Sequence, residues 1–399
     1  MQISVQSINL MGFPMRILSA IHKTLLALGI ATLAACGGGS TTAGGGTMRF
    51  ALTDAPACGY DAVNITVQKV RVHQSASAAD ADGGWSEVVL NPAKRIDLLK
   101  LTNGVLDELG QTALPTGRYT QLRLVLASND ASNPFANSVL PTGGSEVALK
   151  TPSGQQSGVK ANVSLDVAAD KLADFVIDFD ACKSVVSAGN SGQYLLKPVV
   201  SVIPRYVSGV SGFVHASVIS PSTTVSLQQA GATIKATTPD STGKFTLQPV
   251  APGSYTLVVT ASGRITTVVT GVPVAAEAVT NLNTSTTALN PGLTVTGLAQ
   301  GIAPADTFVR ALQPLSGGLV VEVAGRFVDG SGGYSYPLPL SAAQVASYVV
   351  APLPLVFSQD TASVNTYRLS ASLSGFSDKS VTLPPLTASA TTVTNFTFP

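Results

Sequence analysis

The sequence predicts an all-β protein built from tandem β-sandwich domains. Charged residues make up only 11% of its 399 residues, whereas glycine and proline number 37 and 24. Valine and threonine are abundant and long helical patterns are few, which favours strands joined by turns. Several short segments also alternate apolar and polar residues, as strands do when one face is buried. A chain of this length is enough for two or three such domains.

The N-terminal segment predicts export. Two basic residues, Arg16 and Lys23, precede the uncharged run "TLLALGIATLAA", which ends in small residues. This order of basic, apolar and small residues is typical of a secretory signal. Twelve helical residues rise about 18 Å, which is short of a hydrocarbon core of about 30 Å. We therefore expect residues 1–35 to be a signal peptide and not a membrane-spanning helix.

The four residues "LAAC", which end at Cys36, resemble the bacterial lipobox. The resemblance implies that a lipoprotein signal peptidase cuts before Cys36 and that the Cys36 thiol carries a diacylglycerol. Two acyl chains are enough for stable anchoring, because each buried CH₂ contributes roughly 0.8 kcal/mol. Gly37 follows the cysteine where aspartate would favour the inner membrane, so the resemblance implies an outer-membrane location. Residues 36–46 are then a lipidated flexible tether, with a reach of about 18 Å.

A first β-domain is predicted over residues 47–204. In "VNITVQ", Val63, Ile65 and Val67 fall on one face of a strand. The pattern then changes phase before "VRV", which predicts a bulge or a break. The segments "QLRLVL" and "DFVIDFD" alternate in the same way and predict two half-buried antiparallel strands.

Two further elements are expected in this domain. The segment "NGVLDELG" predicts a helical turn that Asn103 caps and Gly110 ends. The segment "QYLLKPVVSVIP" predicts a single last strand, in which Pro198 requires an edge position or a bulge.

Cys58 and Cys182 remain once Cys36 is assigned to the lipid. An even number of cysteines in an oxidising compartment predicts a disulfide. Such a bridge closes a loop of more than a hundred residues and would stabilise the fold by roughly 5 kcal/mol at most. The alternative is a pair of buried free thiols.

The first domain resembles the bacterial family known as domain of unknown function 4382. The resemblance rests on "LTDAPACGYDAVNITVQKVRVH", "LTNGVLDELGQTALPTGRYTQLRLVL" and "DFDACKSVV" with "YLLKPVV", and it includes both cysteines. It implies an extracytoplasmic, β-rich domain, often found on lipoproteins, with no assigned activity.

A second domain is predicted over residues 208–289. Its segment "TPDSTGKFTLQPVAPGSYTLVVTASG" combines glycine turns with alternating strands. It resembles carboxypeptidase regulatory-like domains, which implies a transthyretin-type sandwich grouped with carbohydrate-binding-like folds.

Residues 291–399 repeat this pattern. "DGSGGYSY" matches "DSTGKFTL", so that Asp329 corresponds to Asp240, and "YRLSASLSG" matches "YTLVVTASG". The two matching blocks lie further apart in the third domain, which predicts an insertion near 337–360 with a short helix beginning at "SAAQ".

No motif indicates catalysis or a cofactor. HExxH, CxxC and GxSxG are absent from the sequence, and the glycine-rich stretches lack the context of a phosphate loop. We therefore expect no enzyme activity, no cofactor and no zinc site.

A disulfide would draw four aspartates into one neighbourhood, where oxygen ligands can hold calcium; the alternative is turn, cap and surface roles. These calcium candidates are Asp54, Asp61, Asp178 and Asp180.

The predicted function is that of a membrane-anchored, non-catalytic binding or structural module of the cell envelope. The formal net charge is +1, and no basic patch stands out, so nucleic acid is not an expected partner. The alternative is a carbohydrate-binding surface protein. Candidate sugar platforms are Trp85, interpreted preferentially as a core anchor of "WSEVVL", and Tyr334 with Tyr336, which cross-strand packing explains equally well.

Overall fold

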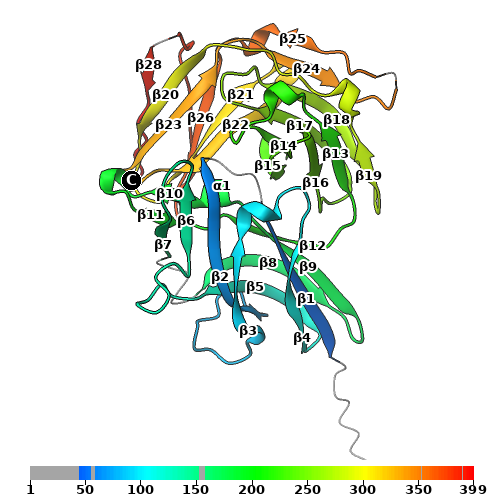
Figure 1. Ribbon diagram of the computed structural model, residues 1–399, viewed down its shortest axis with the longest axis vertical. Coiled ribbons are helices and arrows are strands. Elements are labelled where there is room, and N and C mark those ends of the chain that lie inside the picture. The colour runs from blue at the N-terminus through cyan, green and yellow to red at the C-terminus, as the bar shows by residue number, and fades with distance from the viewer. Residues whose placement is uncertain (1–44, 55–58, 152–157, 352, 389) are drawn as a thin grey trace, which may run out of the picture. The chain divides into compact units, whose positions relative to one another are not determined.

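The computed structural model describes residues 45–54, 59–151, 158–351, 353–388 and 390–399. The predicted signal peptide, Cys36 and Cys58 lie outside these residues. Residues 42–399 form one compact unit (Figure 1). Its described part consists almost entirely of strands joined by turns and short helices, so the predicted all-β, tandem-sandwich class is confirmed.

The first domain packs two sheets face to face. One sheet has the order β12-β9-β1-β4; the other has the order β10-β11-β7-β6-β2-β5-β8, with β3 paired to β2. A single apolar core fills the space between them. The elements are β1 (Gly46–Asp54), β2 (Tyr60–His73), β3 (Ser86–Asp97), the 3-10 helix Leu98–Leu101, β4 (Asp107–Leu114), β5 (Gly117–Leu126), β6 (Ser138–Pro141), β7 (Val147–Lys150), β8 (Val159–Val167), β9 (Leu172–Phe179), α1 (Ala181–Ser184), β10 (Val185–Ser187), the 3-10 helix Gly189–Ser191, β11 (Tyr194–Leu196) and β12 (Val200–Pro204).

Strand β2 follows the predicted change of phase. Val63, Ile65 and Val67 are fully buried, and the core then continues with Val70 and Val72. The register against both neighbouring strands shifts between Val67 and Lys69. The extra residue turns the following side chains back to the core, as a β-bulge does. The predicted bulge is therefore confirmed.

Two expectations for this domain are wrong. Residues 103–110 form no helix: Asn103 has a left-handed φ of 58° in a turn, and β4 begins at Asp107. The last predicted strand is two strands in different sheets, since β11 pairs with β7 and β12 pairs with β9. Pro198, which has no N–H to donate, lies between them where the chain changes sheet.

The second and third domains are sandwiches of the same plan. The second contains β13 (Gly209–Phe213), the 3-10 helix Ala216–Val218, β14 (Thr224–Gln229), β15 (Ala232–Thr237), β16 (Lys244–Leu247), β17 (Gly253–Thr260), β18 (Thr267–Val274), β19 (Val279–Asn281) and the 3-10 helix Ser285–Thr287. The third contains β20 (Thr296–Ile302), β21 (Phe308–Pro314), the 3-10 helix Ser316–Gly318, β22 (Val320–Phe327), β23 (Gly333–Pro339), β26 (Arg368–Ser372), β27 (Lys379–Thr382) and β28 (Thr391–Val393).

The turns at Asp240 in the second domain and at Asp329 in the third domain make the same hydrogen bonds. Asp240 Oδ1 accepts bonds from the Thr242 backbone N–H and hydroxyl and from the Lys244 N–H. Asp329 Oδ1 accepts the corresponding bonds from Ser331 and Gly333. These bonds lower the pKa of both carboxyls, against the opposing effect of burial. The predicted equivalence of the two turns is confirmed.

The insertion near 337–360 is not helical. It contains the strands β24 (Ala343–Ser347) and β25 (Ser358–Asp360), which extend the sheet of the second domain in the order β15-β14-β17-β18-β24-β25. Strand β24 runs parallel to β18 over Thr267–Thr270. The third domain thus supplies two strands to the second, where the edge of β18 would otherwise be free.

Buried polar contacts join the first domain to the second. Lys235 Nζ of the second domain lies 2.6 Å from Asp178 Oδ1 of the first, with side chains 2% and 9% exposed. Asn103 bonds to Thr237 and Thr246 across the same boundary. Because buried charges and amides are costly unless paired, these contacts specify one arrangement of the domains.

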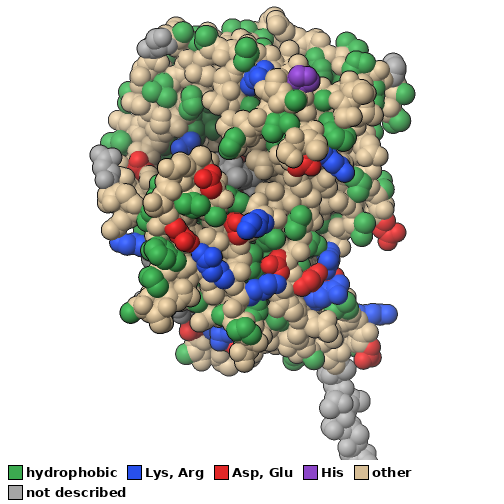
Figure 2. All heavy atoms as spheres, viewed as in Figure 1, with side chains coloured by type: hydrophobic (Ala, Val, Ile, Leu, Met, Phe, Trp, Pro, Cys, Tyr) green, Lys and Arg blue, Asp and Glu red, His purple; other side chains and the backbone are tan. Residues whose placement is uncertain are grey.

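The surface carries mixed charges. On the face drawn in Figure 2, Lys and Arg side chains alternate with Asp and Glu over the first domain, and neither sign forms a large patch. Among the residues that the structure describes, no helix is both long and apolar enough to cross a bilayer.

Candidate functional site

A cavity of about 800 Å³ lies where the three domains meet. Its volume is in the range of ordinary ligand pockets. Much of its wall comes from terminal strands, those at the ends of their sheets: β10 of the first domain, β15 of the second, and β22, β23 and β28 of the third. Figure 1 shows α1 and β10 close to β22 at this junction.

An ion pair between Lys183 and Glu322 lines this cavity. Lys183 Nζ lies 2.9 Å from Glu322 Oε1 and 3.6 Å from Asp180 Oδ2. Burial lowers the pKa of Lys183, but the two carboxylates outweigh burial and raise it overall. The Lys183 ammonium is therefore held charged, and it serves to join the first domain to the third.

Local hydrogen bonds position both partners. Asp180 Oδ1 accepts the Lys183 backbone N–H and so caps α1, which directs Lys183 toward β22. The side-chain amide of Gln228 donates to the Glu322 carbonyl at 2.7 Å and accepts the Glu322 N–H at 2.8 Å. These are the two bonds that a neighbouring strand would make, so Gln228 satisfies the edge of β22 at this point.

An aromatic pair forms another part of the wall. Tyr60 lines the cavity and packs edge-on against Tyr194, with ring centroids 5.9 Å apart. Burial and Tyr194 raise the pKa of Tyr60 to about 12, against a lowering by Arg326. Arg326 also lines the cavity, and its guanidinium lies 5.2 Å from the ring of Tyr336. The site thus combines aromatic rings, hydroxyls and amides with charges that are largely paired.

The four calcium candidates have protein partners. Asp54 Oδ1 accepts the Ala181 N–H, Asp61 accepts the Thr142 hydroxyl, Asp178 pairs with Lys235, and Asp180 caps α1. Within the described ranges, no three His, Cys, Asp or Glu residues are grouped so that they could hold a metal ion. Asp54 and Asp61 each accept a hydrogen bond, as the cap and turn alternative expects. The alternative of a solvated strand face is wrong for Asp178, which is buried and paired with Lys235, and for Asp180, which caps α1.

Asp54 differs from the other three. It is 1% exposed, and its Oδ2 has no hydrogen-bond partner among the residues described. Burial raises the pKa of this carboxyl well above its ordinary value, and Asp180 and Asp178 add to the rise. The charged form of Asp54 is therefore disfavoured in the folded protein.

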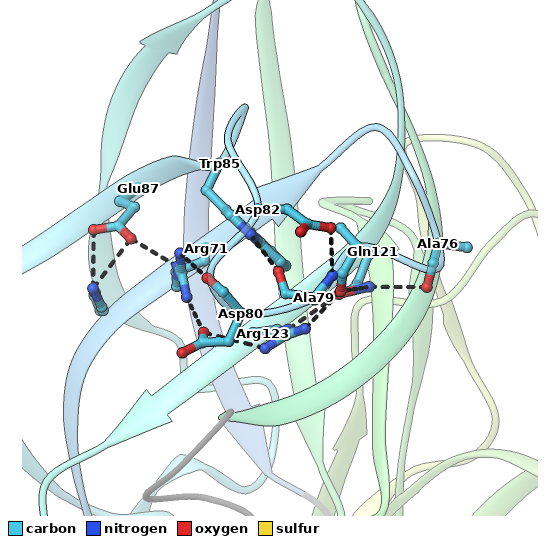
Figure 3. Close-up of polar contacts among 11 residues, drawn as sticks. Arg71, Ala76, Ala79, Asp80, Asp82, Trp85, Glu87, Gln121 and Arg123 are labelled. Carbon is cyan, nitrogen blue, oxygen red and sulfur yellow. Dashed lines mark hydrogen bonds and ion pairs between the residues drawn. The ribbon is translucent and has the colours of Figure 1, made fainter.

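Trp85 belongs to a polar cluster on the outer face of β2 and β5 (Figure 3). Its ring lies over the guanidinium groups of Arg71 and Arg123, at 4.4 and 4.7 Å from the ring centroid. Its Nε1 donates to the Ala79 carbonyl at 3.1 Å. Asp80 pairs with both arginines.

The preferred interpretation of Trp85 as a core anchor is wrong. The side chain is half-buried, immediately precedes β3 and takes no part in the apolar core. It instead packs on Arg71 and Arg123, and the loop of residues 74–85 covers Arg123 and Gln121, which are 4% and 0% exposed. The Trp85 cluster therefore holds this loop on the sheet.

Tyr334 and Tyr336 pack inside the third domain. They are 4% and 1% exposed and belong to its apolar core. The Tyr336 hydroxyl donates to the Val309 carbonyl at 2.5 Å. Packing, the alternative to a sugar platform, is what the structure shows for both side chains.

Sequence reasoning singled out Asp180, Cys182 and Tyr334, which line the cavity, but it missed the central ion pair and the glutamine that positions it. Lys183 and Glu322 line the cavity and Gln228 binds the Glu322 backbone. The three residues come from three different domains and lie far apart in the chain. No local motif marks any of them. The one available signal is a glutamate or glutamine inside an otherwise apolar strand pattern, as in "VVEVAG" and "VSLQQ", since a buried polar residue needs a partner.

Two family models match the chain. Residues 45–198 match the Domain of unknown function (DUF4382), and residues 209–287 match the Carboxypeptidase regulatory-like domain. Both resemblances drawn from the sequence are confirmed. Carboxypeptidase regulatory-like domains are non-catalytic, immunoglobulin-like modules. A comparison with curated proteins gives no match.

Three solved structures show distant likenesses to this chain. Two interface mutants of a type II cohesin–X-dockerin complex from Acetivibrio cellulolyticus are 25% and 28% identical, with TM-scores of 0.19 and 0.18. Each alignment covers 22% of this chain and 58% of that chain. A streptococcal ancillary pilin is 7% identical, with a TM-score of 0.16 and coverage of 88% and 98%. TM-scores this low carry no argument about this chain.

Proposed function

We propose that this chain is a lipid-anchored, non-catalytic binding or structural module of the bacterial cell envelope. The observation that carries the binding role is the cavity at the junction of the three domains. Its central charges, Lys183 and Glu322, are already paired with each other. A site of this kind suits recognition, because a general acid or base would need an ionisable group free to exchange protons with a substrate.

The anchor rests on the sequence pattern that ends at Cys36. Lipid on this thiol would attach the folded body, which begins with β1 at Gly46, to the membrane through the glycine-rich residues 37–45. The outer membrane is the proposed location, because Gly37 is not the aspartate expected for retention at the inner membrane. Export also supports the proposed disulfide between Cys58 and Cys182.

Metabolic labelling tests the anchor. Cells that express the full chain are grown with radiolabelled palmitate, and the parent is compared with Cys36→Ala and with the matched control Ser40→Ala. We expect label and membrane association in the parent and in Ser40→Ala, and loss of both in Cys36→Ala. An unlabelled parent chain, or one recovered from the cytosol, would refute the proposal. Alkylation of the purified protein before and after reduction tests the disulfide.

A glycan-binding role is the second candidate. The specific observation in its favour is the neutral polar lining of the cavity, which includes Gln300, Ser335 and Asn395 beside Tyr60. Amides, hydroxyls and an aromatic ring are groups that can bond or pack against a sugar. A glycan array probed with the full chain separates the two candidates, because an absence of hits above background would remove this one.

A further inference from the structure

Two terminal strands from different domains face each other across the cavity. All three residues of β10 line it, and so do six consecutive residues of β22, Glu322–Phe327. Each strand stands at the end of its own sheet, so one edge of each has no strand partner in the described part of the chain. Unpaired strand edges present backbone N–H and C=O groups that readily accept a further strand.

Contacts at both ends hold these two strands in a fixed relation. At one end, Lys183 binds Glu322. At the other end, the Gly330 N–H donates to the Ser187 carbonyl at 3.0 Å. The residue earlier in the chain on the β10 side, Lys183, contacts the earlier residue on the β22 side, and the later residue, Ser187, contacts the later one. The strands β10 and β22 therefore run in the same direction, and the cavity lies between these two contacts.

At Glu322, a side chain makes the hydrogen bonds that a neighbouring strand would make to the edge of β22. Gln228 both donates to and accepts from the Glu322 backbone. Residues 323–327 continue along the cavity beyond this point. In extended conformation five residues span about 17 Å, which is the length of a typical short strand.

The side chains that line this gap define the chemistry of its occupant. Val185, Val186, Val323 and Ala324 are apolar and small or β-branched. Two charged residues of β22 also line the cavity: Glu322 is paired with Lys183, and the Arg326 guanidinium lies 5.2 Å from the ring of Tyr336. A segment inserted here would therefore gain from uncharged side chains against the four apolar residues, whereas a buried charge without a partner would cost free energy.

We propose that this cavity accepts an extended, uncharged peptide segment of a partner protein, which adds as a strand between the edges of β10 and β22. The inference rests on the proposed binding role and names its partner class. In strand addition, main-chain hydrogen bonds supply affinity and the pockets for alternate side chains supply specificity. The palmitate experiment tests the anchor independently of this site.

The test measures binding of peptides to the full chain purified in detergent micelles. The probes are octapeptides that alternate valine and threonine, each compared with an analogue in which two inner residues are proline. Proline has no N–H and removes ladder hydrogen bonds. At about 1 kcal/mol for each bond, we expect the analogues to bind about tenfold or more weakly.

Two variants fill the cavity from opposite walls. Ala324→Trp places a large ring on β22, and Ser187→Trp does so from β10, where the exposed serine makes misfolding of the variant less of a concern. We expect both to lose peptide binding. The matched control, Ser380→Trp on β27 at the far edge of the same sheet as β22, should bind within about twofold of the parent, because β27 does not line the cavity.

Four outcomes would overturn the proposal. Proline analogues that bind as well as their parents would exclude strand addition. Binding that survives both Ala324→Trp and Ser187→Trp would place it elsewhere. Displacement of the peptides by a neutral oligosaccharide such as maltoheptaose, or dimerisation of the chain in sedimentation that Ala324→Trp abolishes, would assign the cavity to a sugar or to a second copy.

Discussion

Removal of the buried charge at Lys235 should destabilise the protein strongly. Lys235 Nζ lies 2.6 Å from Asp178 Oδ1 in an almost fully buried pair. In Lys235→Met the carboxylate of Asp178 loses its partner while Asp54 and Asp180 remain close enough to interact electrostatically. Breaking a buried pair on one side costs about 3–5 kcal/mol, because an uncompensated charge stays in the interior.

A double-mutant cycle separates the energy of the ion pair between Lys235 and Asp178 from the energy of side-chain packing. We expect Lys235→Met combined with Asp178→Leu to lie within about 1–2 kcal/mol of the parent, since apolar residues of similar volume often replace such a pair without loss. The exposed Lys160, on β8, provides the control substitution Lys160→Met, with an expected change below about 0.5 kcal/mol.

Urea unfolding provides the assay. Circular dichroism follows the whole body, and the fluorescence of the single tryptophan, Trp85, follows the first domain. A cost below about 1 kcal/mol for Lys235→Met would refute the reasoning, and so would a double variant as unstable as the two single changes added together.

Three further predictions follow from particular contacts. Asn103→Ala should cost more stability than Asn103→Gly in urea unfolding, by roughly 1 kcal/mol, since both lose the side-chain bonds to the second domain but only alanine is strained at a φ of 58°; equal costs would exclude strain. Trp85→Ala should release residues 74–85 and speed their limited proteolysis at least severalfold, whereas Trp85→Phe should retain part of the protection, because a phenyl ring can still pack on Arg71 and Arg123; identical rates for parent and Trp85→Ala would contradict this role. Between the ordinary and the raised pKa of Asp54, the folded protein holds a proton that the unfolded chain has lost, so this residue lowers stability as the pH rises through that interval; Asp54→Asn keeps the bond from Ala181 and should flatten the decline in stability above the ordinary pKa of a carboxyl in denaturant titrations, and an unchanged slope would count against it.

Local structure could be predicted where the physical signal is local. Alternation identified the buried face of β2, and its change of phase located the bulge after Val67. The spacing of aspartate and glycine identified the turns at Asp240 and Asp329, because an Asx turn bonds only to residues two to four positions ahead.

Contacts between domains could not be predicted in this way. The segment "SAAQ" carries a helix-capping pattern, yet β24 forms because the edge of β18 is available to it. Tertiary context overrides a weak local preference of this kind. Trp85 was misjudged for a related reason: the sequence shows its apolar ring but not the two arginines beneath it, which come from β2 and β5. The partners of Lys183 and Glu322 depend likewise on the way three separate sandwiches dock.

The parallel pairing of β24 with β18 has a consequence for anyone who divides this protein. A cut near residue 290, between the two C-terminal sequence repeats, would leave the second domain without the strands β24 and β25 and expose the edge of β18 at Thr267–Thr270. Fragments produced by such a cut should aggregate or bind each other through this edge, as the halves of a split reporter protein do. A fragment for expression that keeps the hydrogen bonds between β18 and β24 must therefore contain both repeats.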